Sequence, residues 1–219
     1  MEQTFIQARE DAERLRRRHG YLLIKRIFDI GFSVTVLGTL SWLFLLVALA
    51  IKLDDPRGPV FFIQERIGAS GNPFYMIKFR SMCVDAEQQV ESLQMLNERD
   101  GPAFKILDDP RITNVGRFIR RMNIDELPQF VNVLRGDMSV VGPRPALQRE
   151  VIRYTDYQRL RLLIKPGITC LWQIDPNRDN LTFDEWVARD LRYLHECSAL
   201  YDLNIIFRTI GCTLRGNGA

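Results

Sequence analysis

The longest apolar stretch of the chain, residues 31–51, has no charged side chain in 21 consecutive positions. Folded as a helix, it would extend about 30 Å, roughly the thickness of the hydrocarbon core of a bilayer. A buried helix of a globular protein is rarely apolar on all sides over this length. A cleaved signal peptide does not fit, because the stretch starts late and no small-residue cleavage site follows it. The pattern therefore predicts a membrane-embedded helix.

The charges on either side of the apolar stretch predict its orientation. Residues 4–28 have an Arg-rich amphipathic helical pattern, whereas only Lys52 and Arg57 follow the stretch closely. Positive charge is retained on the cytoplasmic side, which places the N-terminus in the cytoplasm. If the rest of the chain uses a cytoplasmic substrate, the helix must enter the bilayer and turn back. No proline forces such a bend, but three residues could permit it: Gly31, Gly38 and Ser41. A straight span is the alternative.

Beyond residue 52 the pattern changes repeatedly and predicts short elements. Two strands, at residues 60–62 and 74–79, are joined through the turn-rich residues 68–73, as in a hairpin. Residues 83–98 are polar and indicate either a surface helix or a mobile loop. The remaining expected elements are helices at residues 115–134, 146–163, 184–196 and 200–214 and a short strand at 171–174.

The sequence therefore predicts an α/β fold that is mostly helical. We expect residues 1–52 to form the Arg-rich segment and the membrane-embedded, re-entrant helix, and residues 53–219 to form a small cytoplasmic domain. The last helix has an apolar stripe made by Leu200, Leu203, Ile206, Phe207 and Ile210. Such a stripe is typical of core packing, and near a membrane helix it also suits an interfacial helix that lies on the bilayer.

Composition and charge exclude several classes of protein. A net charge of +3 over 219 residues is too small to indicate a nucleic-acid partner. The four cysteines, Cys83, Cys170, Cys197 and Cys212, are scattered and no CxxC pair occurs. With His19 and His195 as the only histidines, a zinc site or a histidine-based triad is not expected, and the thiols suit a reducing compartment.

The segment from Asp109 to Pro145 carries the candidate chemistry. An adjacent acidic pair, Asp125 and Glu126, lies among six arginines: Arg111, Arg117, Arg120, Arg121, Arg135 and Arg144. Arginine holds phosphate oxygens through paired N–H donors, and a positive setting keeps a carboxylate ionised for metal binding or nucleophilic attack. Pro128 fits the first turn of a helix, which puts Asp125 near a helix N-terminus. The alternative is a solvated helix face with ordinary ion pairs.

Several motifs in a fixed order give the chain a family resemblance. They are Gly58-Pro59-Val60-Phe61-Phe62, Gln64-Glu65-Arg66-Ile67-Gly68, Lys78-Phe79-Arg80-Ser81-Met82, Asp125-Glu126-Leu127-Pro128-Gln129, Gly136-Asp137-Met138-Ser139, Gly142-Pro143-Arg144-Pro145 and Lys165-Pro166-Gly167-Ile168-Thr169. With them, residues 20–219 resemble the bacterial sugar transferases. These are monotopic phosphoglycosyl transferases of the bacterial inner membrane that begin capsule, exopolysaccharide or glycoprotein glycan assembly.

The resemblance implies a transferase with a covalent intermediate. In that family the aspartate of an Asp-Glu pair attacks the β-phosphorus of a UDP-sugar, UMP leaves, and a polyprenyl phosphate, normally undecaprenyl phosphate, then takes the phosphosugar. Mg²⁺ is required. Carried over, Asp125 is the nucleophile and a Mg²⁺ ligand, and Glu126 positions or assists it. The candidates for substrate binding are Lys78, Arg80, Arg111, Arg144 and Arg178.

The same resemblance implies partners and a location. The expected partners are the UDP-sugar, the polyprenyl phosphate and membrane lipids, with a homo-oligomer left open. We expect the catalytic domain to face the cytoplasm. The family's re-entrant helix bends at a Ser-Pro, whereas this chain has Ser41-Trp42. The loop from Ile174 to Arg178 is altered as well, so the identity of the sugar stays open.

Two other functions fit the residues. A membrane-anchored, metal-dependent phosphohydrolase would use water in place of the lipid acceptor. A basic membrane scaffold would use the arginines to bind anionic lipid head groups. The scaffold has no need of the acidic pair or of the Gly142–Pro145 turn.

Overall fold

The computed structural model describes residues 2–106 and 108–214 as a mostly helical fold with two two-stranded sheets. Its α-helices are α1 (Glu2–Arg17), α2 (His19–Thr39), α3 (Ser41–Asp54), α4 (Asn114–Arg121), α5 (Gln129–Arg135), α6 (Gln148–Ile152), α7 (Asp156–Arg159), α8 (Phe183–Glu196) and α9 (Ala199–Leu214). Its strands are β1 (Phe61–Ile67), β2 (Pro73–Phe79), β3 (Ser139–Val141) and β4 (Gly167–Thr169). Its 3₁₀-helices are η1 (Ala69–Gly71), η2 (Gln94–Leu96), η3 (Ile124–Glu126), η4 (Leu160–Leu163) and η5 (Arg178–Asn180).

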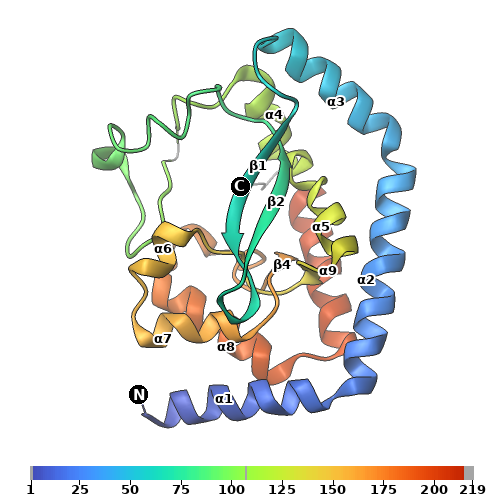
Figure 1. Ribbon diagram of the computed structural model, residues 1–219, viewed down its shortest axis with the longest axis vertical. Helices are drawn as coiled ribbons and strands as arrows, with labels where there is room; N and C mark the ends of the chain where they lie inside the picture. The colour runs from blue at the N-terminus through green and yellow to red at the C-terminus, as the bar shows by residue number, and fades with distance from the viewer. Residues whose placement is uncertain (1, 107, 215–219) are drawn as a thin grey trace.

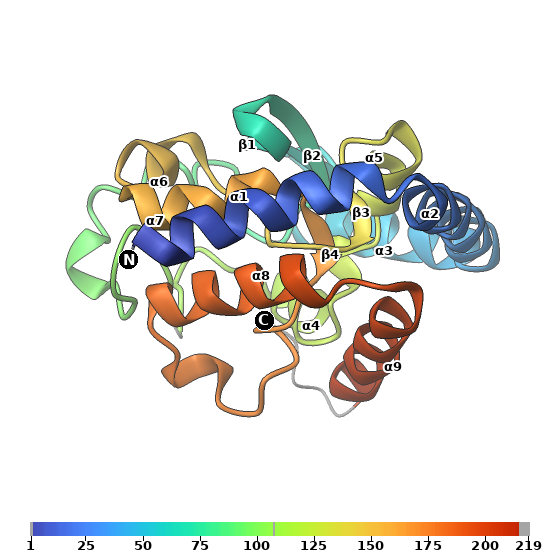
Figure 2. The same ribbon diagram turned by 90° about the horizontal axis from the view of Figure 1, so that it is seen from below.

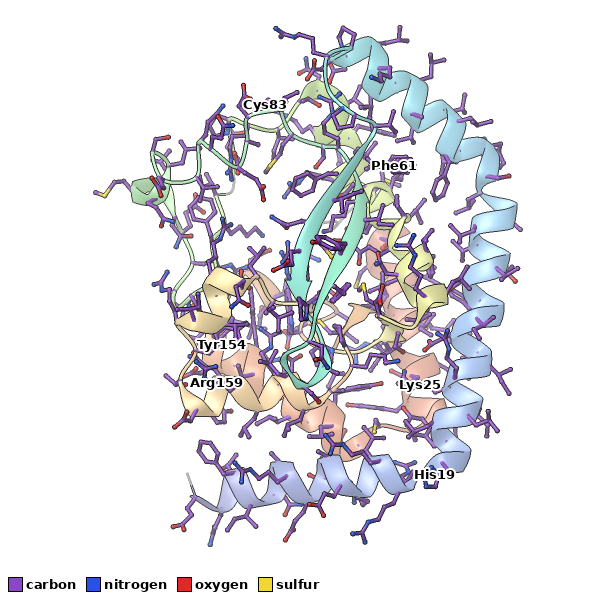
Figure 3. All side chains as sticks on the ribbon, viewed as in Figure 1. His19, Lys25, Phe61, Cys83, Tyr154 and Arg159 are labelled. Atoms are coloured by element: carbon purple, nitrogen blue, oxygen red, sulfur yellow. The ribbon has the colours of Figure 1, made fainter. Side chains whose placement is uncertain are left out.

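The long helices form a frame around the smaller elements (Figure 1). Helix α2 runs along one side, α1 crosses one end, and α3 bends over the other end. The hairpin β1–β2 lies inside this frame, with α5 and α9 between it and α2. Seen from below, α1 and α8 lie side by side (Figure 2). Side chains from these elements project into the space that they enclose (Figure 3).

The predicted hairpin is confirmed, and its first strand is longer than expected. Strands β1 and β2 are antiparallel, with Phe61 opposite Phe79 and Ile67 opposite Pro73. The expected strand at residues 171–174 is wrong, because this segment forms a turn. Trp172 packs there on Trp186 of α8, with ring centroids 4.1 Å apart, so its apolar character serves the core and not a sheet.

The parallel pair of β3 and β4 was not expected. Its second strand, β4, ends just before the 171–174 turn. Strands this short leave too few positions for an alternating pattern to be recognised in the sequence.

The apolar stretch forms two helices, α2 and α3, bent by 60°. The break is at Leu40, between two of the residues expected to permit a bend, Gly38 and Ser41. Hydroxyl groups before and after the break donate to carbonyls of the preceding turn: Thr39 to Thr35 at 2.7 Å and Ser41 to Gly38 at 2.9 Å. Such bonds compete with the helical ladder and bend helices without a proline.

The bent pair is also the one membrane candidate within residues 2–106 and 108–214. No single helix there is long and apolar enough to cross a bilayer, whereas α2 and α3 together pass by length and composition. Side chains on their outer faces are largely exposed: Leu23 and Ile27 on α2, and Leu45 and Leu53 on α3.

The single helix expected at residues 4–28 is wrong, because the chain turns at Arg18 and forms α1 and α2. The guanidinium of Arg18 donates to the carbonyl of Cys197 at 2.7 Å, which ties the turn to the end of α8. Helix α1 buries Ala8, Asp11 and Ala12, and Asp11 contacts His195 of α8 at 2.9 Å. Helix α1 is therefore packed against α8 of the same chain on this face.

Two other expected helices are interrupted. The segment expected to be helical at residues 115–134 ends α4 at Arg121, passes through η3, and restarts as α5. The cause is Asn123, whose φ of 53° is in the left-handed region that ends a right-handed helix. Residues 146–163 form α6, α7 and η4, and residues 83–98 contain turns and η2 but no α-helix. Helices α8 and α9 are confirmed nearly at their expected bounds.

Polar residues dock α2 on the rest of the chain. Arg26 donates to the carbonyls of Val133 and Leu134 at 2.6 and 2.7 Å, where the negative end of α5 favours a cation. The buried carboxylate of Asp29 accepts from the backbone amide of Val140 at 3.0 Å. Helix α2 is thus tied to α5 and β3, and the predicted division of the chain at residue 52 stays a prediction.

A buried carboxylate completes this docking. Asp202 of α9 accepts from Lys25 of α2 at 2.9 Å, from Tyr21 at 2.8 Å and from Tyr193 of α8 at 2.7 Å. Both members of the Lys25–Asp202 ion pair are largely shielded from solvent. Removal of one partner would leave the other as a buried, uncompensated charge, which is far more costly than the loss of an exposed pair.

We therefore expect Asp202→Asn to lower the free energy of unfolding by roughly 3 kcal/mol. Glu196→Gln is the matched control, because it breaks the exposed Arg192–Glu196 pair and should cost less than about 1 kcal/mol. Chemical denaturation of both variants in detergent micelles measures the difference. Equal losses would show that the Asp202 network does not hold α2 in place.

Candidate active site

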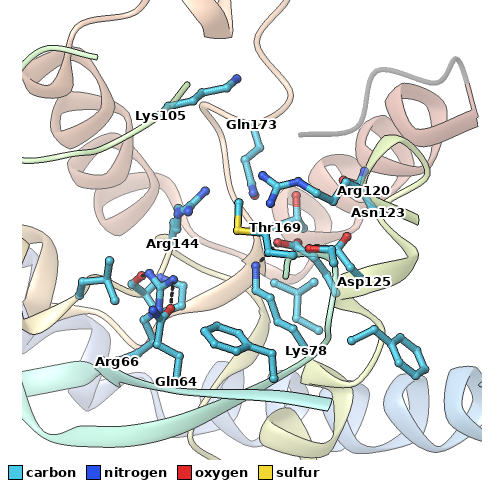
Figure 4. A pocket seen from close by; sticks show the side chains of 18 of the residues that line it. Gln64, Arg66, Lys78, Lys105, Arg120, Asn123, Asp125, Arg144, Thr169 and Gln173 are labelled. Carbon is cyan, nitrogen blue, oxygen red and sulfur yellow. Dashed lines mark hydrogen bonds and ion pairs between the residues drawn. The ribbon is translucent and has the colours of Figure 1, made fainter. Parts of the chain in front are cut away.

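A cavity of about 900 Å³ lies between the hairpin, the segment from α4 to α5, and the turn at residues 142–147 (Figure 4). One part of its wall is charged and includes Lys78, Asp125 and Arg144. Another part is apolar. It is formed by Phe32 and Val36 of α2, by Leu40 at the break after α2, and by Ile206 and Ile210 of α9. The cavity therefore offers a charged site and an apolar surface to the same ligand or to two ligands.

The left-handed residue Asn123 places the acidic pair on the cavity wall. It turns the chain after α4, so that η3 carries Asp125 and Glu126 just before α5 begins after Pro128. The side-chain amide of Asn123 donates to the hydroxyl of Thr213 on α9 at 3.1 Å, which fixes this turn from the other side. The expected position of Asp125 near a helix N-terminus is thus realised as a 3₁₀ turn ahead of α5.

The neighbouring cations make the two buried carboxylates unequal. Asp125 is only 7% exposed, and this burial, with the negative charge of Glu126, raises its pKa to about 6 although Lys78 and Arg120 favour the ionised form. Burial opposes the ionised form of Glu126 too, but Lys78, Arg144 and Arg120 outweigh it, so the pKa of Glu126 is lowered. Glu126 therefore stays ionised at neutral pH, whereas the charge of Asp125 changes as the pH passes through about 6.

Lys78 joins the hairpin to the acidic pair. Its ammonium group contacts the Glu126 carboxylate at 2.7 Å. Strand β2 is held next to α5 by Asn132, a fully buried residue of that helix. Its side chain accepts from the backbone amide of Ile77 at 3.0 Å and donates to the carbonyl of Tyr75 at 2.7 Å. The amide of Asn132 acts here as a neighbouring strand would, and so positions Lys78.

Two arginines face the acidic pair without a partner of their own. Neither Arg120 nor Arg144 makes a side-chain hydrogen bond or ion pair with any described residue, and both line the cavity (Figure 4). Arg144 was among the expected binding residues, whereas Arg120 was not. Its spacing from Asp125 gave no signal, because the helix that would have related the two is broken at Asn123.

Two expected binding residues have their donors engaged elsewhere. Arg80 donates to Asp55 and to the carbonyl of Pro59, and so closes the turn after α3. Arg111 donates from Nε to Asp109 at 2.9 Å and from a terminal nitrogen to the carbonyl of Ala86 at 2.9 Å. Both line the cavity wall, but their guanidinium groups serve these loops. Their predicted contact with phosphate stays a prediction.

Arg178 lies on another part of the cavity wall. It begins η5, and Arg99 and Lys105 line the same part. Lys105 contacts the carboxylate of Asp179 at 3.0 Å, and Arg99 donates to the carbonyl of Asp179 at 2.7 Å. Arg99 also donates to the carbonyl of Arg178 at 3.4 Å, which links the end of the altered loop at residues 174–178 to the segment before α4.

The carboxylates suit a metal that is held jointly with a substrate. Among the described residues no group of three or more His, Cys, Asp or Glu side chains could hold an ion by itself. Mg²⁺ commonly takes one or two carboxylates and completes its coordination with substrate phosphates and water. Glu126 is engaged by Lys78, which leaves Asp125 as the carboxylate that fits this arrangement.

Comparisons with known proteins give the chain a family. The model for "Bacterial sugar transferase" matches residues 20–216. The galactosyl transferase CpsE of Streptococcus agalactiae is 45% identical over 92% of this chain and 44% of its own length. The undecaprenyl-phosphate galactose phosphotransferase of Salmonella typhimurium is 40% identical over 90% and 41%. The exopolysaccharide production protein ExoY of Sinorhizobium fredii is 39% identical over 88% and 87%. The chain spans less than half the length of the first two relatives.

The raised pKa of Asp125 predicts that this residue destabilises the fold. Its pKa lies near 3.8 when unfolded and about 6 when folded, so the folded state binds the proton more tightly. The contribution of Asp125 to the free energy of unfolding is most favourable below pH 4, and it is lost as the pH rises through 6. We expect the free energy of unfolding of Asp125→Asn to exceed that of the wild type by on the order of 2 kcal/mol at pH 7.5.

Denaturation at pH 4.5, 6 and 7.5 measures this effect, and the gain from Asp125→Asn should grow with pH. Asp108→Asn is the control, because the side chain of Asp108 is 96% exposed and its replacement should change stability by less than about 0.5 kcal/mol. A loss of stability for Asp125→Asn at pH 7.5 would contradict the assignment of Asp125 as a strained, buried charge.

Proposed function

Because the chain belongs to the bacterial sugar transferase family, we propose that it transfers a phosphosugar from a UDP-sugar to a polyprenyl phosphate, normally undecaprenyl phosphate. The observation that carries the proposal is the buried carboxylate of Asp125 in a cavity it shares with Lys78, Arg120 and Arg144. Two relatives, an undecaprenyl-phosphate galactose phosphotransferase and an exopolysaccharide production protein, support the substrate class and a role in initiating glycan assembly.

Asp125 is the nucleophile of the proposed reaction. With a pKa of about 6 it is mainly ionised at neutral pH. Its carboxylate oxygen forms a bond to the β-phosphorus of the donor, and the bond from that phosphorus to the bridging oxygen breaks. UMP leaves with the electron pair, and the phosphosugar stays on Asp125. The cations around the site offset the negative charge that otherwise repels a carboxylate from a diphosphate.

The acceptor completes the cycle. An oxygen of the lipid phosphate attacks the phosphorus of the intermediate, and the Asp125 carboxylate leaves as an anion. A phosphate oxygen is already ionised at neutral pH, so this step needs no general base. Glu126 therefore has another role, which is to hold Lys78 at the site through their 2.7 Å contact.

The apolar wall supports a lipid acceptor. Phe32, Val36 and Ile206 line the same cavity as Asp125. We propose that α2 and α3 enter the inner membrane and turn back at Leu40, with the cavity facing the cytoplasm and its apolar wall open to the polyprenyl chain. The 60° bend and the exposed apolar faces of both helices support this arrangement. A homo-oligomer stays a prediction.

A UMP-release assay in the presence and absence of undecaprenyl phosphate tests the proposal. With the lipid, the wild type should turn over repeatedly on its preferred UDP-sugar. Without it, release should stop at about one equivalent per enzyme, since covalent catalysis requires the acceptor to regenerate Asp125. A phosphohydrolase would continue without lipid, and a membrane scaffold would release no UMP.

Variants of the acidic pair identify the intermediate. Asp125→Asn should lower the rate of UMP release by at least about 10³-fold and give no covalent adduct by intact-protein mass spectrometry. Glu126→Gln should react slowly and accumulate the adduct, because Lys78 loses its anchor. Arg192→Gln, an exposed residue of α8, is the control and should behave as the wild type. Normal turnover by Asp125→Asn would rule out the proposed mechanism.

Mg²⁺ is the proposed cofactor, held by Asp125 together with the donor phosphates. When bound, such an ion neutralises diphosphate charge. Chelation with EDTA should therefore stop UMP release by the wild type, and MgCl₂ should restore it. Full activity in EDTA would remove Mg²⁺ from the proposal and leave the arginines and Lys78 as the source of positive charge.

A further inference from the structure

Arg66 of β1 is a buried cation in the wall of the cavity. It is 7% exposed, and its side chain lies beside Gln64 and below Arg144 (Figure 4). One terminal nitrogen donates to the carbonyl of Pro145 at 3.1 Å, and the other donates to the side chain of Gln64 at 2.6 Å. These two contacts orient the guanidinium group, but neither partner carries a charge.

The positive charge of Arg66 has no counter-ion among the described residues. Its Nε makes no hydrogen bond, and no carboxylate of the described residues forms an ion pair with it. The two nearby carboxylates have other partners: Glu150 accepts from the backbone amide of Leu147, and Glu126 accepts from Lys78. Buried charges in folded proteins are almost always paired, because an unpaired one loses its hydration without compensation.

The nearest cations oppose the charge of Arg66. Burial, followed by the positive charge of Arg144, lowers the pKa of Arg66 to about 10, and Arg149 acts in the same direction, whereas the charges of Glu150 and Glu126 act in the opposite direction and offset only part of this shift. In contrast, the other buried arginines of this region are neutralised: Arg80 by Asp55, Arg111 by Asp109, and Arg161 by Asp190. Arg66 therefore differs from them in the one respect that matters for a ligand.

We infer that Arg66 and Arg144 form an anion subsite for the α-phosphate of the donor, the phosphate that leaves as part of UMP. This inference rests on the proposed function. In Figure 4, Lys78 lies between Asp125 on one side and the Arg66–Arg144 pair on the other. A diphosphate whose β-phosphorus is at Asp125 thus has its α-phosphate directed toward the two arginines.

The subsite acts where charge develops during the reaction. As the carboxylate oxygen of Asp125 bonds to the β-phosphorus, the bond from this phosphorus to the bridging oxygen breaks, and both electrons remain on that oxygen. The UMP formed carries one more negative charge on the α-phosphate than the diphosphate had there. Guanidinium groups fixed in advance at this position stabilise that charge without having to reorganise.

Binding of UMP and of uridine to the full chain in lipid nanodiscs tests the inference. Isothermal titration calorimetry on Arg66→Met should give a Kd for UMP weaker by on the order of tenfold to hundredfold than that of the wild type, with the Kd for uridine unchanged. Arg66→Lys keeps the charge but loses the paired donors, so its Kd should lie between the two. Arg192→Gln is the control and should bind both ligands as the wild type does.

Thermal unfolding without ligand separates a binding role from a structural one. Replacement of an unpaired buried charge by an apolar side chain should leave the Tm of Arg66→Met equal to or above that of the wild type. Its Tm should no longer rise on addition of UMP, whereas that of the wild type should. A lowered Tm with unchanged UMP affinity would overturn the inference, as would an equal loss of affinity for UMP and uridine.

The outcome is independent of the test of the proposed function. Arg66-dependent binding of UMP together with normal turnover by Asp125→Asn would keep the subsite and reject the covalent mechanism. An inactive Asp125→Asn together with wild-type UMP affinity in Arg66→Met and Arg66→Lys would keep the mechanism and reject the subsite. If Arg66→Met does not fold, wild-type affinity of Arg66→Lys for UMP overturns the inference alone.

Discussion

The burial of Asp125 beside a second carboxylate is the constraint on which the site depends. Two adjacent carboxylates in a shielded cavity favour protonation, and a protonated Asp125 could not act as a nucleophile. Lys78 relieves this conflict by neutralising Glu126 at 2.7 Å, so that the remaining charge is carried by Asp125. The position of Lys78 in turn depends on β2, which Asn132 holds through two hydrogen bonds to its backbone.

The docking of α2 connects this site to the apolar exterior of the molecule. Arg26 and Asp29 bind α2 to the end of α5 and to β3, the elements that follow the acidic pair in the chain. The same helix contributes Phe32 and Val36 to the cavity and exposes Leu23 and Ile27 on its other face. In the proposed membrane arrangement, a helix with charged residues on its protein side and apolar residues on its outer face sets the depth of the proposed nucleophile relative to the bilayer.

The sequence was sufficient for features that depend on local pattern. The hairpin, α8, α9 and the apolar stretch follow from periodicity and turn residues over short windows, and the order of the motifs identified the family. It was not sufficient where tertiary contacts decide. The turn at Arg18 depends on a carbonyl of Cys197, and the break at Asn123 depends on a left-handed residue that touches Thr213. Because of that break, Arg120 lies at the site although its spacing from Asp125 in the sequence does not predict this position.

The arginines show why residue type alone could not assign the binding site. Arg80 and Arg111 occur in motifs that suggest phosphate contact, but each is paired with an aspartate and closes a loop. Arg66 has the same side chain and similar burial, and no acidic partner among the described residues. A buried cation that the protein neutralises itself has its desolvation cost offset by its partner, whereas one that it leaves without a counter-ion costs stability until an anion binds. The presence or absence of that partner, which only the folded chain reveals, distinguishes a structural arginine from one that binds a ligand.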